Sequence, residues 1–152
     1  FIEWNYKQGL DWLLLDYDMH RKLKEFSRTL NRFYKRNPTM WEIDYSWEGF
    51  SWISSDDSAN SVIAFRRIDK SGDELIAVCN FTPVTREKYR IGVPEKGTYR
   101  TEFGGRGTKI QKTYTSKPIP MHSFEQSISL TLPGLSVVYL KKQGKKTNNK
   151  EE

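Results

Sequence analysis

Hydrophobic residues recur at helical spacing near the start of the chain. The residues are spaced at intervals of four, three, four and three positions: Met19, Leu23, Phe26, Leu30 and Phe33. This spacing places all five on one stripe of an α-helix and predicts a helix over residues 16–37. Such a stripe needs a partner to bury it, and the sequence predicts no second helix. We therefore expect the chain to be the end of a larger protein, divided inside a domain.

Polar residues mark the two ends of this helix. Asp16 or Asp18 can cap its start, and Asn37 followed by Pro38 ends it. Residues 1–15 contain Gly9 among aromatic and leucine residues and are expected to form a packed loop that leads into the helix.

After residue 60 the hydrophobic period changes to alternation, which is typical of strands. The predicted strands are 61–68, 74–81, three strands around Ile91, Thr101 and Leu130, and 136–142. Residues 75–79 are continuously apolar, so their strand should be central and covered on both faces. Residues 39–60 are expected to be a connection. The predicted fold is mainly β: an antiparallel β-sandwich preceded by one amphipathic α-helix.

The alternation also predicts which side chains are buried. The expected core residues are Val62, Phe65, Ile76, Val78, Phe81, Ile91, Leu130 and Val138. The helix stripe should either fold back on the sandwich, near Trp12, Trp41 and Trp47, or pair with a second copy of the chain as a homodimer. The first arrangement is slightly favoured because these tryptophans are close in sequence.

Composition fits one domain, or a small domain with an appendage. The chain has 152 residues, of which 36% are hydrophobic and 14% aromatic, enough for a core. Its apolar runs are too short to span a membrane, and its start does not read as a signal peptide. The single cysteine, Cys79, excludes an internal disulfide and indicates a reducing, cytoplasmic location.

The positive charge is concentrated in the tail. The net charge is +6, and residues 141–152 carry five lysines and two glutamates, which is +3 of that total. Residues 145–152 are polar and expected to be disordered. A nucleic-acid interface needs a folded basic patch, so we expect no nucleic-acid binding.

Candidate catalytic groups are scattered. His20, His122 and Cys79 lie far apart in sequence, so neither a metal site nor a nucleophilic centre is expected, and no cofactor. Residues 104–107 are glycine-rich, but no helix follows them, which favours a mobile hairpin over a phosphate-binding loop. Asp56 and Asp57 are expected to lie in a turn, because glycosidase carboxylates sit on separate elements.

All five tryptophans fall within the first 52 residues. Aromatic rings fill cores and interfaces, and they also stack on sugar rings. For Trp12, Trp41, Trp47 and Trp52 a place in a core or interface is favoured. Trp4 stands between Glu3 and Asn5, which can bind hydroxyl groups, so packing and sugar contact remain equally open there.

Several segments occur in an order that resembles a known family. They are Phe-Ile-Glu-Trp-Asn at 1–5, Leu-Asp-Trp at 10–12, Leu-Asn-Arg-Phe-Tyr at 30–34, Gly-Phe-Ser-Trp-Ile at 49–53, Asp-Asp-Ser-Ala-Asn-Ser-Val at 56–62, Val-Cys-Asn-Phe-Thr-Pro-Val at 78–84 and Ser-Leu-Thr-Leu-Pro at 129–133. Over residues 1–142 the chain resembles the C-terminal part of bacterial-type glycogen branching enzymes, of the α-amylase superfamily.

This resemblance implies a parent with a (β/α)8 barrel followed by an all-β C-terminal domain. The helix would be the last of the barrel, which would explain its unpartnered stripe. The parent would cleave α-1,4 glucan bonds and form α-1,6 branches by a retaining route that uses three carboxylates upstream of this chain. The fragment would hold no catalytic residue. The loop at 99–107 is shorter than is usual in the family, so a sugar contact from it is not carried over.

Substrate contact would come from Glu3, Trp4 and Asn5, because barrel active sites are built from loops that follow the strands. The expected divisions are 1–38, the last barrel loop and helix; 39–45, a connection; 46–142, the sandwich; and 143–152, a basic tail. Two alternatives remain: a free-standing carbohydrate-binding sandwich and a protein-interaction sandwich. The partners expected for the first interpretation are an α-glucan and the missing barrel.

Overall fold

The computed structural model of the chain describes residues 3–104 and 112–144. The helical elements are η1 (Trp12–Asp16), α1 (Asp18–Arg36), η2 (Pro38–Met40) and η3 (Trp47–Gly49). The strands are β1 (Phe50–Asp57), β2 (Val62–Ile68), β3 (Glu74–Asn80), β4 (Arg86–Val93), β5 (Thr98–Gly104), β6 (Thr113–Thr115), β7 (Gln126–Leu132) and β8 (Ser136–Lys142).

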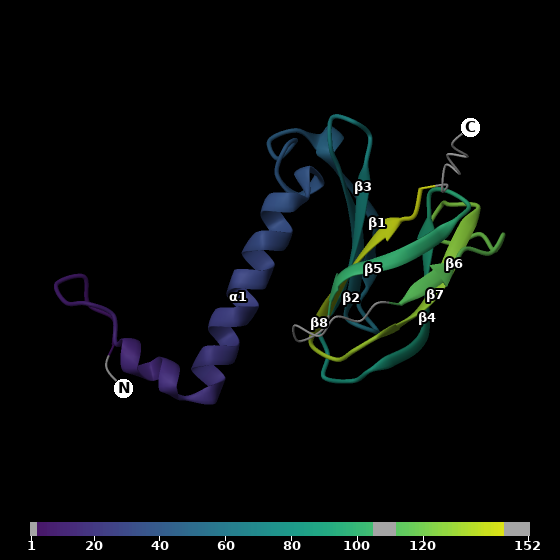
Figure 1. Cartoon of the computed structure of the whole chain (residues 1–152). Helices are drawn as coiled ribbons and strands as arrows, with labels where there is room; N and C mark the ends of the chain where they lie inside the picture. The colour runs from purple at the N-terminus through teal and green to yellow at the C-terminus, as the bar shows by residue number, and fades with distance from the viewer. Residues whose placement is uncertain (1–2, 105–111, 145–152) are drawn as a thin grey trace, which may run out of the picture.

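The strands form two antiparallel sheets. One has six strands in the order β1-β2-β3-β8-β5-β6, and the other pairs β4 with β7. The two sheets pack face to face, and α1 runs along the other side of the larger sheet (Figure 1). The predicted antiparallel β-sandwich, preceded by one helix, is confirmed.

The core lies between the two sheets and follows from alternation along the strands. The buried hydrophobic cluster consists of Ile53, Val62, Ala64, Ile76, Val78, Ile91, Val93, Tyr99, Ile128, Leu130, Leu132, Val138 and Leu140. The expected core residues are therefore buried, with two exceptions. Phe65 is only half-buried, on the outer face of β2.

Phe81 is the second exception, and its predicted burial is wrong. Its side chain is 61% exposed. β3 ends at Asn80, whose polar side chain takes the last buried place, and the Phe81 amide donates to the Ser61 carbonyl at 3.0 Å. Asn80 therefore follows Ile76 and Val78 on the inner face of the strand, and the Phe81 side chain lies outside the core.

The stripe of α1 is covered along only part of its length. The Phe33 ring lies 5.0 Å from that of Phe103 and 5.2 Å from that of Tyr139, and the Phe26 ring lies 6.1 Å from Phe103. Met19 and Leu23, nearer the start of the helix, are 73% and 62% exposed. In Figure 1 the end of α1 lies against the larger sheet and its start leans away.

The expected fold-back of the helix is thus confirmed for its second half and wrong for Leu23. The aromatic rings of β5 and β8 receive the stripe, whereas the sequence favoured the tryptophans. β3 is central as predicted, because Leu75 and Ala77 are buried on its outer face while Ile76 and Val78 are buried on its inner face.

Arg67 of β2 fastens the connection after α1 to the sheet. Its guanidinium donates to the carbonyls of Thr39 and Met40 at 3.3 Å and Ile43 at 3.4 Å, and it pairs with the Asp44 carboxylate at 2.8 Å. The side chain is only 15% exposed. Arg67 therefore helps to hold the turns that follow α1 against the sandwich.

Other predictions for the first 60 residues need correction. Residues 39–60 are not only a connection, because β1 forms over Phe50–Asp57 and places Asp56 and Asp57 in a strand. The start of α1 has no side-chain cap: Tyr17 is at the N-cap position, and Asp18 forms ion pairs with Arg21 and Lys22 in the first turn.

Residues 3–15 are mostly exposed. The prediction that this segment forms a packed loop is therefore also wrong for its described residues. The tail 145–152 and most of the glycine-rich segment 104–107 lie outside the described residues. Among the described helices, none is long and apolar enough to cross a membrane.

Candidate functional site

The segment before α1 carries the residues expected to contact a sugar. It extends away from the sandwich and touches the rest of the described chain through α1 (Figure 1). The Trp4 side chain is 69% exposed, so one of its two open interpretations, packing inside this chain, does not hold. An exposed indole next to polar side chains is the arrangement in which an aromatic ring stacks on a sugar face.

Asn5 shapes the turn that presents Trp4. The Lys7 amide donates to Asn5 Oδ1 at 3.0 Å, and the Gln8 amide donates to the Asn5 carbonyl at 3.2 Å. Asparagine favours such turns because its side chain imitates a backbone carbonyl. Within the described residues, the Glu3 carboxylate and Asn5 Nδ2 have no hydrogen bond, so both remain available to hydroxyl groups.

The other tryptophans are not in the core of this chain. Trp12, Trp41, Trp47 and Trp52 are 64%, 42%, 84% and 51% exposed, which excludes the core interpretation and leaves the interface one. Trp52 lies edge-on to the Phe50 and Phe65 rings on the outer face of the larger sheet, at 5.0 and 6.0 Å between centroids.

The candidate catalytic groups do not come together. His122 Nδ1 accepts the Gly92 backbone N–H at 3.2 Å, and burial lowers the pKa of this histidine. His20 lies on α1, away from the sandwich core. Burial raises the pKa of the Cys79 thiol, which disfavours the reactive thiolate form. In the described part of the chain, no group of three His, Cys, Asp or Glu side chains is arranged to hold a metal.

Asp57 has a structural role. Its carboxylate accepts from the Tyr89 hydroxyl at 2.6 Å and from Asn60 Nδ2 at 2.9 Å, and these bonds, the one from Tyr89 first, lower its pKa. Burial, followed by the hydrogen bond to Asp57, raises the pKa of Tyr89. This network ties the end of β1 to β4 and leaves Asp57 no place in a catalytic pair with Asp56.

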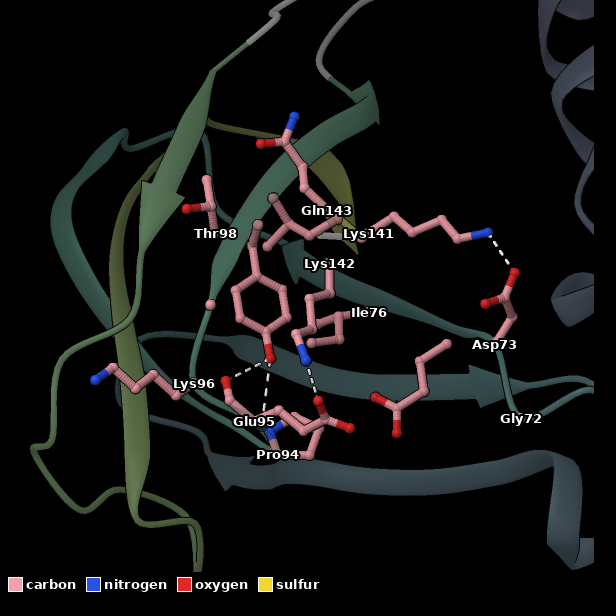
Figure 2. A pocket seen from close by; sticks show the side chains of 15 residues that line it. Gly72, Asp73, Ile76, Pro94, Glu95, Lys96, Thr98, Lys141, Lys142 and Gln143 are labelled. Carbon is pink, nitrogen blue, oxygen red and sulfur yellow. Dashed lines mark hydrogen bonds and ion pairs between the residues drawn. The ribbon is translucent and has the colours of Figure 1, made fainter. Parts of the chain in front are cut away.

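A hollow that the sequence did not predict opens at one end of the sandwich. We call it the end pocket; its volume is about 640 Å³. It is lined by the turn between β2 and β3, the start of β3, the turn between β4 and β5, and the end of β8 (Figure 2). Because these segments are far apart in sequence, no local motif could have indicated it.

Comparison with known proteins agrees with this fold. A family model described as the alpha amylase C-terminal all-beta domain matches residues 52–143, which is more than half of the chain. The chain belongs to this family. The match begins inside β1 and ends one residue after β8, so it covers the sandwich except for the first two residues of β1.

Similar curated proteins extend the likeness to the helix. The chain is 49% identical to the 1,4-alpha-glucan branching enzyme GlgB of Halothermothrix orenii, 45% to that of Aquifex aeolicus and 42% to that of Francisella philomiragia. The alignments cover 93%, 95% and 93% of this chain. They cover only 24%, 24% and 23% of the relatives, so the chain spans about a quarter of their length.

Proposed function

We propose that this chain is the C-terminal part of a 1,4-α-glucan branching enzyme and that it performs no chemistry by itself. One observation carries this proposal: relatives with that name match nearly the whole chain, but only about a quarter of their own length. The parent would cleave α-1,4 glucan and rejoin the fragment as an α-1,6 branch during glycogen synthesis. Its catalytic carboxylates would lie in the part of the enzyme that the chain does not align with.

The half-open stripe of α1 supports this proposal. Met19 and Leu23 are exposed although they continue the stripe that Phe26 and Phe33 bury. A large hydrophobic surface left open on a small domain marks an interface. In the proposed parent, a catalytic barrel covers this half of the helix and the neighbouring exposed tryptophans.

Glu3, Trp4 and Asn5 are proposed to contact the glucan in that parent, with the indole stacking on a sugar ring and the two polar side chains bonding hydroxyl groups. We also propose that the divisions are 1–38 for the barrel segment, 39–45 for the connection, 46–142 for the sandwich and 143–152 for the tail. We further propose that the protein is cytoplasmic. The fragment alone is proposed to form a homodimer through the exposed half of the α1 stripe.

The direct test joins this chain to the upstream three-quarters of the Halothermothrix orenii relative, in place of that enzyme's own C-terminal quarter. Amylose is incubated with the chimera, with the 152-residue chain and with the truncated relative, and the iodine absorbance is followed. We expect the absorbance to fall with the chimera only. Sustained activity of the 152-residue chain, or an inactive but folded chimera, would contradict the proposal.

The sugar contact is tested in the same chimera. Trp4→Ala should lower kcat/KM for amylose about tenfold, because a stacking contact worth roughly 1–1.5 kcal/mol is lost. Tyr45→Ala is the control, because Tyr45 is a fully exposed aromatic residue in the connection. Equal effects of the two substitutions would remove Trp4 from the proposed site.

A further inference from the structure

The side of the larger sheet that faces away from the core is apolar across most of its width. Alternation along the strands directs two rows of side chains to this side, and the register places the members of each row next to one another. The first row, from β1, β2, β3, β8 and β5, is Trp52, Phe65, Ala77, Tyr139 and Phe103; the second, from β2, β3 and β8, is Ile63, Cys79 and Val137. We call these residues the outer face.

The outer face contains no Asp, Glu, Lys or Arg. The charged residues that follow it on β2 and β8 are Arg67 and Lys141, and they are already paired with Asp44 and Asp73, each at 2.8 Å. A sheet that is apolar on both sides is covered on both sides. The smaller sheet covers the inner side, so a second layer is expected over the outer face.

The helix α1 supplies only part of this layer. Its Phe33 ring packs on Phe103 and Tyr139, which belong to β5 and β8. At the other end of the first row Trp52 is 51% exposed and Phe65 is half-buried, and the members of the second row are all half-buried. A helix is about 10–12 Å across and neighbouring strands are about 4.8 Å apart, so one helix covers about two strands. The strands β1, β2 and β3 therefore leave room for one further helix beside α1.

Two more apolar side chains continue the outer face past the ends of β3 and β8. Phe81 follows Cys79 by two positions and Leu135 precedes Val137 by two, which is the spacing of one side of a strand. They are 61% and 59% exposed. The Leu135 N–H donates to the Thr82 carbonyl at 2.7 Å, so the two turns that carry these side chains are joined. The exposed apolar surface therefore extends beyond the strands and is held in a fixed arrangement.

We propose that the outer face, together with Phe81 and Leu135, is the docking surface for one amphipathic helix of the upstream part of the parent, lying beside α1. This inference rests on the proposed function, in which the part of the relatives that the chain does not cover, about three quarters of their length, lies upstream. The segment before α1 lies on the α1 side of the larger sheet, so the upstream part joins the chain on the side of the outer face (Figure 1).

The outer face also defines the chemistry of its partner. It offers rings and aliphatic groups without a free charge, so the docking helix presents an apolar stripe at three- and four-residue spacing. The surface is continuous with the contact that Phe33 makes on Phe103 and Tyr139, and the new helix extends that layer. The orientation of the sandwich in the parent is then set by the sheet as well as by α1.

The test is hydroxyl-radical footprinting of the 152-residue chain and of the chimera with the upstream part of the Halothermothrix orenii relative. Exposed aromatic and sulfur-containing side chains are oxidised, and mass spectrometry gives the rate at each residue. Trp52 and Phe81 should be oxidised about fivefold more slowly in the chimera, because the centre of a protein interface is buried. Met121, which lies against Gly92 on the side of the smaller sheet, should be oxidised equally in both proteins.

A double variant tests the exposed end of the surface. Phe81→Lys with Leu135→Lys adds two charges that an apolar helix cannot pair. In the chimera it should return the oxidation of Trp52 to the rate in the 152-residue chain. Ile119→Lys is the matched control, because Ile119 is also an exposed hydrophobic residue but lies between β6 and β7, and it should leave Trp52 protected. Protection that survives the double variant would contradict the proposal.

A photo-crosslinking amino acid in place of Ile63 identifies the occupant. Crosslinks in the chimera should fall on one upstream segment, at positions three or four residues apart. Crosslinks to a second copy of the chain or to alternate residues of a strand would overturn the proposal, as would unchanged oxidation of Trp52 in a folded chimera. A chimera that branches amylose with the outer face open contradicts only this inference, whereas a folded, protected but inactive chimera contradicts only the proposed function.

Discussion

Asn80 is a polar side chain in the core that fixes two turns. It is 2% exposed, and its Nδ2 donates to the carbonyls of Val84 at 2.8 Å and Pro133 at 3.1 Å. Its Oδ1 accepts from the Thr82 amide at 3.0 Å and from the Thr82 hydroxyl at 2.8 Å. The Asn-Phe-Thr-Pro segment therefore has a structural explanation: its asparagine joins the turn after β3 to the turn before β8.

Asn80→Ala should destabilise the chain by about 2–4 kcal/mol, because it leaves buried carbonyl groups without donors. Urea unfolding followed by tryptophan fluorescence measures this loss. Asn31→Ala, the same change at an exposed position of α1, should stay within about 0.5 kcal/mol of the parent chain. Similar losses in both variants would mean that the network around Asn80 contributes little.

His122 makes stability depend on pH. The neutral ring accepts the Gly92 N–H, and burial lowers the pKa below the usual 6.5 although Asp56 and Asp57 oppose the shift. As pH falls through about 6.5, the unfolded chain takes up a proton before the folded chain does. Stability from this residue is therefore full above that pH and is lost as pH falls toward the folded pKa.

His122→Asn should reduce this loss. The residue has a positive φ of 51°, a conformation that asparagine tolerates, so the backbone should be kept. Urea midpoints of both chains are compared at about pH 7.5 and about pH 5.5, on either side of the unfolded pKa. The midpoint of the unsubstituted chain should fall more between these conditions. A parallel fall in the two chains would assign the pH dependence to other groups.

The elements differ in how clearly the sequence encodes them. β8 has the predicted boundaries, β2 and β3 differ from prediction by one residue at one end, and α1 is shorter by two residues at its start and one at its end. β1 was missed because its Ser- and Asp-rich sequence contains two register shifts, after Trp52 and after Ser54, which break the alternation. Three-residue β6 is too short to show a period.

The connection after α1 contributes an anchor that spacing could not predict. Arg67 alternates with core residues on β2, which suggests a solvent-facing charge, yet it is bonded to three carbonyls and to Asp44. Its partners are separated from it by more than twenty residues. Only the fold brings the turn around η2 over the outer end of β2.

Arg67→Met should loosen this connection while keeping the aliphatic stem. We expect a loss of about 2–3 kcal/mol from the removed charged hydrogen bonds, and faster amide exchange at Trp41 and Glu42, whose amides donate to the Pro38 carbonyl at 3.0 and 2.8 Å. Arg32→Met, at an exposed position of α1, is the control. Unchanged exchange at Trp41 would show that the connection holds without Arg67.

The described molecule combines a buried core between the two sheets with an exposed hydrophobic surface on the first half of α1 and the segment before it. The sandwich buries a hydrophobic cluster between its two sheets, and its fold could be predicted from alternation. The placement of Glu3, Trp4 and Asn5 in an extended, exposed segment could not, since nothing in the local pattern separates a packed aromatic loop from an open one. The end pocket could not be predicted from the sequence either, because Asp73, Glu95 and Lys142 come together only when the strands assemble.

The open surface predicts that the two halves of α1 respond differently to substitution. In the 152-residue chain, Phe33→Ala should cost about 1.5–2.5 kcal/mol, less than for a fully buried phenylalanine, because the ring is half-buried against Phe103 and Tyr139. Leu23→Ser should change stability by less than about 0.5 kcal/mol, because Leu23 is 62% exposed.

In the chimera with the upstream part of the Halothermothrix orenii relative, the proposed barrel buries Leu23 as well. Leu23→Ser should then cost about 2–3 kcal/mol and lower the unfolding temperature, while the cost of Phe33→Ala stays the same. Calorimetry of both variants in both contexts measures the four values. A Leu23→Ser cost that stays negligible in an active chimera would show that the barrel leaves this half of the helix in water, and the proposed docking face would have to lie elsewhere.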